Sequence, residues 1–168
     1  MPVFASVRHT SWSDLAAQIR TYHDAWEAAG HPGRGQVFVS APTYIAETEE
    51  RARSEPRESI MHFYHEQANL LEGAAKLVDP ATAARRMRRV HDLRARSYED
   101  ALGANVLIGT PDTIAEKLEV LQAEIGLSGI LAELNCGGLI PHRQVVSAMQ
   151  LLCEQVMPQF ALTNGASR

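Results

Sequence analysis

The chain has 168 residues, enough for one domain with a substantial core. Its hydrophobic content of 45% and charged content of 21% are ordinary for a soluble globular protein, and its net charge of −4 argues against a nucleic-acid partner, which would require a basic surface. No apolar run reaches the roughly 18 residues that span a bilayer, and residues 1–10 lack the features of a signal peptide, so we expect a cytoplasmic protein with no membrane partner.

The first part of the chain predicts a strand, a helix and a second strand. Residues 2–6 form a short β-like run, and Ser11 then begins a helix with Asp14 as its capping-box partner. Gly30 ends this helix, and the second strand covers residues 37 to about 44. At helical spacing, the predicted buried face of the helix carries Leu15, Ile19, Tyr22 and Trp26.

The middle of the chain predicts three helical segments rich in charge. Thr48 begins the first segment as its N-cap, and Pro56 interrupts it. A second segment covers residues 56–71, and Asp79–Pro80 begins a third by the pattern of a cap followed by proline. Residues 106–108 are a short apolar stretch that fits a brief extended segment.

The last third predicts a helix, a strand and a final helix. Thr110 caps the first helix, Pro111 takes its first position and Gly126 ends it. Its apolar stripe consists of Ile114, Leu118, Leu121 and Ile125. A mostly apolar strand, typical of one covered on both faces, contains Ile130, Leu131, Ala132 and Leu134. Pro141 begins the final helix, whose predicted core-facing residues are Val145, Met149, Leu152 and Val156.

This alternation of helices and strands predicts an α/β fold with parallel strands joined by right-handed crossovers. Three strands are predicted, or four if residues 106–108 count as one. A parallel sheet this small leaves both edges open, which is a physical reason to expect a missing partner. Because the residues after Pro158 are small and polar, we predict one folded unit over residues 1–158 and a flexible tail over residues 159–168.

Several separated stretches resemble one known family. The run GTPDTIAEKL, the later run ILAELNCGGLIP and a helix ending in VMP are similar to the C-terminal end of the luciferase-like flavin-dependent monooxygenases. Residues 28–56, AAGHPGRGQVFVSAPTYIAETEERARSEP, resemble the penultimate strand of that family and its following helix, and MPVFAS resembles the strand before. The resemblance implies a helix-rich part of a (β/α)₈ barrel, of which this chain holds the last three or so β/α units.

The same resemblance implies a function. Enzymes of this family use reduced flavin, usually FMN supplied by a separate flavin reductase, and dioxygen to oxygenate a small organic substrate, and a deazaflavin is the alternative cofactor. The N-terminal strands of the family and its flavin-phosphate turn would precede Met1. We therefore expect an N-terminal half or a homo-oligomeric partner, in addition to the reductase and the substrate. The alternative is a non-catalytic remnant or an oligomerising binding module.

Candidate site positions follow from the implied barrel, where chemistry occurs at the carboxyl ends of the strands. These ends correspond to residues 6–8, 43–44 and 135–138. The turn HPGRG contains two glycines and an arginine, but it precedes a strand and so lies at the wrong end of a barrel for a phosphate loop.

Four residues are the predicted cofactor-binding or pocket-lining positions. Asn135 fits a hydrogen bond to a flavin or substrate carbonyl, or a role in the tight turn that continues through Gly137 and Gly138. Tyr44 either stacks on a ring or fills the core. Cys136 lies in the same turn, but no neighbouring residue marks it as an activated thiol.

Two charged clusters have simple alternatives to a functional role. His62 and His65 lie near Glu58 and Glu66, but their order matches no zinc-helix motif, so a solvated helix face is the simpler interpretation and no metal is predicted. The run RRMRRVHDLRAR at residues 85–96 fits binding to phosphates, to the acidic face of a partner or to RNA. It also fits an amphipathic helix with a basic outer side, and the acidic net charge argues against RNA. No arrangement carries the local signature of a nucleophilic hydrolase, and the catalytic residues stay unassigned.

Overall fold

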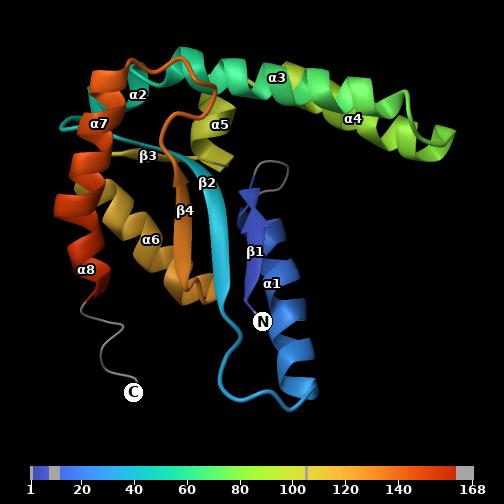
Figure 1. Cartoon of the computed structure of the whole chain (residues 1–168), viewed down its shortest axis with the longest axis horizontal. Coiled ribbons are helices and arrows are strands. Elements are labelled where there is room, and N and C mark those ends of the chain that lie inside the picture. The colour runs from blue at the N-terminus through green and yellow to red at the C-terminus, as the bar shows by residue number, and fades with distance from the viewer. Residues whose placement is uncertain (1, 8–11, 105, 162–168) are drawn as a thin grey trace.

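The computed structural model describes residues 2–7, 12–104 and 106–161, and these residues form a parallel sheet with helices on one face and at its carboxyl end (Figure 1). The strands are β1 (Val3–Ser6), β2 (Val37–Ile45), β3 (Leu107–Gly109) and β4 (Gly129–Glu133). The helices are α1 (Trp12–Ala28), α2 (Glu49–Ser54), α3 (Arg57–Ala75), α4 (Pro80–Ala95), α5 (Tyr98–Ala104), α6 (Pro111–Ile125), α7 (His142–Leu151) and α8 (Met157–Ala161), with the π-helical turn η2 (Leu152–Val156) between the last two.

Strand β2 is the centre of the sheet. Its first half pairs with β1 along one edge and with β4 along the other, so that Phe38 lies beside both Phe4 and Gly129. Its second half pairs with β3, where Thr43 lies opposite Leu107. Every pairing is parallel, which confirms the predicted α/β fold, and the outer strands β1, β3 and β4 each pair with β2 alone.

The outer face of the sheet is covered by helices. Alternate residues of β2 point to this face and are buried against α1, α6 and η2, because a strand presents successive side chains to opposite faces. Figure 1 shows α1 and α6 on the same side of the strands. This first core contains Leu15, Ile19, Val37, Val39, Ala41, Ile114, Leu118, Leu121, Ile125, Leu152 and Val156.

A second core lies beyond the carboxyl end of the sheet. It joins Tyr44 of β2 and Ile108 of β3 to α3, α4 and α5. Helices α3 and α4 form a hairpin that reaches past β1 in Figure 1. Arginines of α4 tie the two helices together. Arg94 Nη2 donates to Glu72 Oε2 at 2.7 Å and to Asn69 Oδ1 at 3.3 Å, and Arg86 Nη1 donates to the Ala74 carbonyl oxygen at 2.5 Å. The helical residues of this core are Ile60, Phe63, Tyr64, Ala68, Val90, Leu93, Tyr98 and Ala101.

The helix boundaries confirm three of the predicted caps. Thr48 Oγ1 accepts a hydrogen bond from the Arg51 amide at 3.2 Å, and Thr110 Oγ1 accepts one from the Thr113 amide at 3.3 Å. Asp79 Oδ1 accepts bonds from the amides of residues 81 and 82, both at 3.0 Å. Each side chain pairs donors that the first turn of a helix cannot satisfy internally. The predicted cap Ser11 lies outside the described residues.

The structure differs from the sequence prediction in four places. Helix α5 was not predicted. The prediction that β4 is covered on both faces is wrong, since Leu131 is 59% exposed on the face opposite the helices. Met149 does not face the core either; the fully buried residue of α7 is Ala148, whose small side chain permits close packing. Helix α8 continues past Pro158, and residues 162–168 of the predicted tail lie outside the described range.

The acidic side chain of Glu49 links α2 to the start of α6. Its Oε1 accepts hydrogen bonds from Thr113 Oγ1 at 2.5 Å and from the Thr110 amide at 3.1 Å. The bond from Thr113 is the main cause that lowers the pKa of Glu49 below its ordinary 4.5. A lowered folded-state pKa adds stability above pH 4.5, which is lost as the pH falls through the lowered value.

We therefore expect Glu49→Gln to lower stability at pH 7 and to flatten the loss of stability below pH 4.5. Urea denaturation over a pH series measures both effects. The matched control is Glu50→Gln, which changes the next residue of α2, an exposed carboxylate. An acid dependence that is the same in the Glu49 variant and the unmodified chain would contradict this prediction.

Candidate functional site

The second face of the sheet is left uncovered by the described residues, and we call it the inner face. It is formed by the side chains that alternate with the buried ones, namely Phe4, Ser6, Phe38, Ser40, Leu131 and Glu133. Phe4 is 70% exposed although it is a large apolar residue. Its ring stacks on that of Phe38, with centroids 5.1 Å apart and planes 18° apart. A contiguous exposed apolar surface of this kind marks an interaction or ligand site.

A fixed carboxylate lies at the carboxyl end of the inner face. Glu133 accepts a short hydrogen bond from Ser40 Oγ on its Oε1 and one from Cys136 Sγ, at 3.5 Å, on its Oε2. Two donors on two different segments hold the group in one orientation. Parallel sheets bind ligands at this end, so the carboxylate is placed where chemistry occurs in such folds.

Glu133 was missed by the sequence analysis. Its one signal is an acidic residue at the end of an otherwise apolar strand, within the run ILAEL. The pairing with Ser40 spans 93 positions of sequence, and the parallel register that brings the two residues together is visible only in the folded sheet.

The predicted site residue Asn135 is engaged in the turn that follows β4. Its backbone carbonyl accepts a hydrogen bond from the Gly138 amide at 2.9 Å, and its Oδ1 accepts one from the Ile140 amide at 3.0 Å. The side-chain amide is exposed at the same end of the sheet as Glu133. The structure therefore gives Asn135 a turn-forming contact and leaves its pocket-lining role a prediction.

Helix α3 clamps this turn through Ser59. The buried Ser59 Oγ donates to the Cys136 carbonyl oxygen at 2.7 Å and accepts from the Leu139 amide at 3.0 Å. His62 Nδ1 lies 3.0 Å from the Gly137 carbonyl oxygen. Gly137 has φ +94°, and a side chain there would overlap the Ser59 carbonyl group. The turn thus rests directly on the helix backbone.

Tyr44 lies in the second core, away from the inner face. Its side chain is 1% exposed, and its hydroxyl donates to Glu55 Oε2 at 2.5 Å. Burial is the largest cause that raises the pKa of Tyr44, followed by the hydrogen bond to Glu55. A ring enclosed in this way packs between the sheet and α3 and offers little surface to a ligand.

The other candidate positions are dispersed. Ser6 ends β1 on the inner face, residue 8 lies outside the described residues, and Thr43 is buried with its Oγ1 donating to the Ala41 carbonyl oxygen at 2.9 Å. Within the described ranges, no group of three or more His, Cys, Asp or Glu side chains could hold a metal ion. No helix there is long and apolar enough to cross a membrane.

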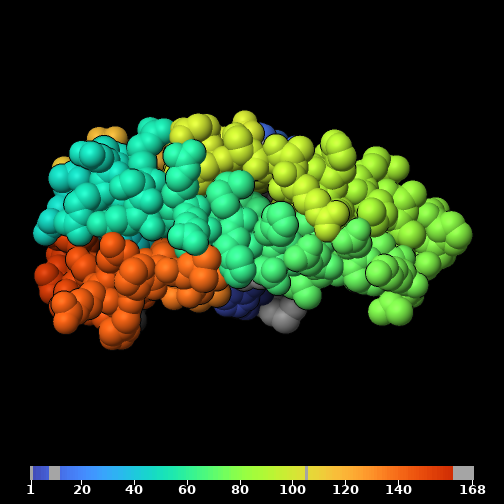
Figure 2. Space-filling model, turned by 90° about the horizontal axis from the view of Figure 1, so that it is seen from above, coloured from blue at the N-terminus to red at the C-terminus, as the bar shows by residue number. Residues whose placement is uncertain are grey.

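The arginine-rich run forms α4 and packs as an amphipathic helix. Val90 and Leu93 are buried, and Arg96 lies 5.1 Å from the centroid of the Tyr64 ring. Three of its six arginines thus contact the α3 side of the hairpin, counting Arg86 and Arg94. Figure 2 looks toward the carboxyl end of the sheet. In this view, α2 to α5 and the turn before α7 form a continuous surface.

Gly137 and Gly138 provide a matched pair of positions for testing the contact between α3 and the turn after β4. Gly137→Ala should destabilise the protein by more than about 2 kcal/mol, because it adds a clash with the α3 backbone to the strain of a positive φ. Gly138→Ala should cost only about 1–2 kcal/mol, since φ is +79° but a side chain there meets open space. Urea denaturation compares them, and equal losses would contradict a close contact between the turn and α3.

Comparison with known proteins identifies the family. A family model described as luciferase-like monooxygenase matches residues 1–128, and no curated protein matches the chain. Monooxygenase RslO1 from Streptomyces bottropensis is similar in structure, with a TM-score of 0.61 at 19% identity over 95% of this chain and 42% of that one.

Two further solved structures share the fold. The oxygenating constituent of 3,6-diketocamphane monooxygenase from Pseudomonas putida, in complex with FMN, has a TM-score of 0.62 at 20% identity over 89% of this chain and 40% of that one. The coenzyme F420 dependent tetrahydromethanopterin reductase from Methanopyrus kandleri has a TM-score of 0.55 at 18% identity, covering 89% and 43%. The chain spans about two fifths of the length of these structures, so its sheet is part of a barrel. The chain belongs to the luciferase-like monooxygenase family.

Proposed function

We propose that this chain forms the closing part of a flavin-dependent monooxygenase barrel, in which reduced FMN and dioxygen oxygenate a small organic substrate. The observation that carries the proposal is the uncovered inner face, which ends in the Glu133 carboxylate. In a complete barrel this face would line the interior. Family membership supports the reaction class. One neighbour in complex with FMN supports a flavin cofactor, and another that depends on coenzyme F420 keeps a deazaflavin as the alternative.

The inner face fits the ring of a flavin better than its phosphate. Phe4, Phe38 and Leu131 provide an apolar wall for one side of a flat ring, with Ser40 and Glu133 at its polar end. The charged group on this face is a carboxylate, which repels a phosphate. The phosphate would therefore be held by the missing strands. When bound, the flavin supplies the redox chemistry, while these residues orient the ring and exclude water.

The expected partners follow from the outer strands. β1 and β4 each have one edge left unpaired by the described residues, and both run in the direction that a parallel barrel requires. We propose that an N-terminal half, supplied by a longer polypeptide or a separate chain, pairs with these edges. A flavin reductase would supply the reduced cofactor. Asn135, Gly137 and Gly138 would then border the pocket from the turn after β4.

A second candidate function is supported by the same exposed edges. Strands with unpaired backbone groups and a large apolar face favour association, so the chain would act as an oligomerising binding module without catalysis. Analytical ultracentrifugation of the chain alone discriminates the two. A well-folded monomer argues against the module, whereas a stable oligomer that binds no FMN after addition of an N-terminal half supports it.

The proposed function can be tested with two matched variants. The chain is produced together with the N-terminal half of a luciferase-like barrel, and FMN binding is measured by fluorescence quenching alongside NADH-dependent oxygen uptake with a flavin reductase. Leu131→Arg should abolish both signals, because it places a charge on the inner face. Val120→Arg changes a residue of α6 with similar exposure, 53% against 59%, and should retain them.

Absence of both signals with the unmodified chain would overturn the proposed function. So would equal signals from the two arginine variants, because the inner face would then have no part in flavin binding. Circular dichroism of each variant establishes that a loss of signal is not a loss of fold.

A further inference from the structure

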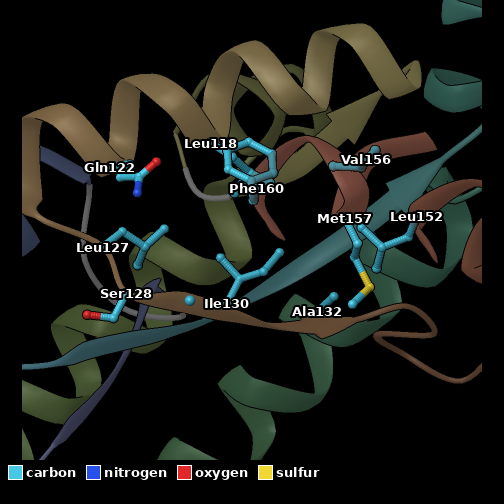
Figure 3. Close-up of a pocket in the computed structure, with 11 residues that line it drawn as sticks. Leu118, Gln122, Leu127, Ser128, Ile130, Ala132, Leu152, Val156, Met157 and Phe160 are labelled. Atoms are coloured by element: carbon cyan, nitrogen blue, oxygen red, sulfur yellow. The ribbon is translucent and has the colours of Figure 1, made fainter. Parts of the chain in front are cut away.

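A groove opens on the opposite side of the sheet, among the helices of the outer face (Figure 3). Its volume is about 360 Å³, within the range of small-molecule sites. It lies between α6, β4 and the helix that runs through η2 into α8. The lining residues are Leu118, Gln122, Leu127, Ser128, Gly129, Ile130, Ala132, Leu152, Val156, Met157 and Phe160.

The groove is apolar along most of its length and polar at one end. In Figure 3, Leu118, Phe160 and Ile130 surround its middle, and Met157 lies toward the far end. Gln122 and Ser128 lie at the other end, with Leu127 between them. This separation of an apolar body from a polar end is the complement of an amphiphilic molecule.

A positive charge borders the polar end. Arg34 and Gln36 line a second hollow that shares Gln122, Leu127 and Ser128 with the groove, so the two hollows adjoin. The Arg34 guanidinium lies over Gly126, where a side chain would come within 2.5 Å of Cζ. Its Nε and Nη2 both lie 3.4 Å from His23 Nδ1, and no carboxylate of the described residues forms an ion pair with the guanidinium.

The other polar groups at this end are also hydrogen-bond donors. Ser128 Oγ accepts from the Val37 amide at 3.1 Å, an arrangement in which its own hydroxyl hydrogen is available to donate. The Gln122 amide adds N–H donors from α6. A guanidinium, a hydroxyl and an amide around one opening form a site that favours an anion.

We propose that this groove binds a free alkyl carboxylate of medium chain length, with the alkyl chain between α6, β4 and α8 and the carboxylate at Arg34, Gln122 and Ser128. Burial of the chain provides the affinity, and the donors fix its direction. The site is separate from the inner face, because Ile130 and Ala132 point to the outer side of β4 while Leu131 points to the inner side. It does not depend on flavin chemistry.

Calorimetric titration with octanoate, below the concentration at which it forms micelles, tests the site directly. We expect saturable binding, with amide NMR shifts concentrated in α6, β4 and α8. 1-Octanol has the same chain without the charge and should bind about fivefold more weakly, and octylammonium should bind more weakly still. Absence of saturable octanoate binding, or equal affinities for the three compounds, would overturn the proposal.

Two variants test the charged end and the alkyl end of the bound ligand, and a third serves as a control. Arg34→Gln should weaken octanoate about fivefold and leave 1-octanol unchanged. The matched control Arg143→Gln removes an exposed arginine of α7 that lines neither hollow, and it should change neither affinity. Ala132→Phe fills the groove and should abolish binding of both compounds. Urea denaturation checks the fold of each variant. Unchanged octanoate binding in either Arg34→Gln or Ala132→Phe would contradict the assigned site.

Discussion

The double pairing of β2 is the constraint on which the rest of the structure depends. Because its first half bonds to β1 on one edge and β4 on the other, every side chain near it is assigned to one of two faces. The outer face is apolar and filled by helices. The inner face keeps large apolar side chains exposed next to a fixed carboxylate. A one-residue shift in register would exchange these two surfaces, so both proposed sites rely on the same strand alignment.

The sheet shows how the length of the chain bears on its function. The chain aligns with about two fifths of each barrel it resembles, and the segment it covers contains complete β/α units with their own helices and cores. Parallel strands form local units of strand and crossover helix, so a part of a barrel can retain native packing on its helix side. What such a part lacks is the opposite wall. The exposed Phe4 and Leu131 mark the surface where that wall would lie.

Much of the fold could be predicted from local sequence signals, since the caps at Thr48, Asp79 and Thr110 depend on neighbouring residues alone. The candidate site was less predictable. The sequence favours a core role for Tyr44 only slightly over a role as a ring partner, and the placement of α3 decides which contacts it makes. Ser40 and Glu133 meet through long-range register, which periodicity does not encode. The outer groove likewise depends on how closely α8 approaches α6, a matter of tertiary packing.

The hydrogen bonds between Ser59 and the turn after β4 join two parts of the chain that are 77 to 80 positions apart in sequence. Ser59 holds both sides of the turn, and α3 continues from it into the hairpin with α4 that reaches past β1. Ser59 lies in the first turn of α3, so a displacement of this end of the helix would also displace Cys136 and the Glu133 carboxylate that Cys136 helps to hold.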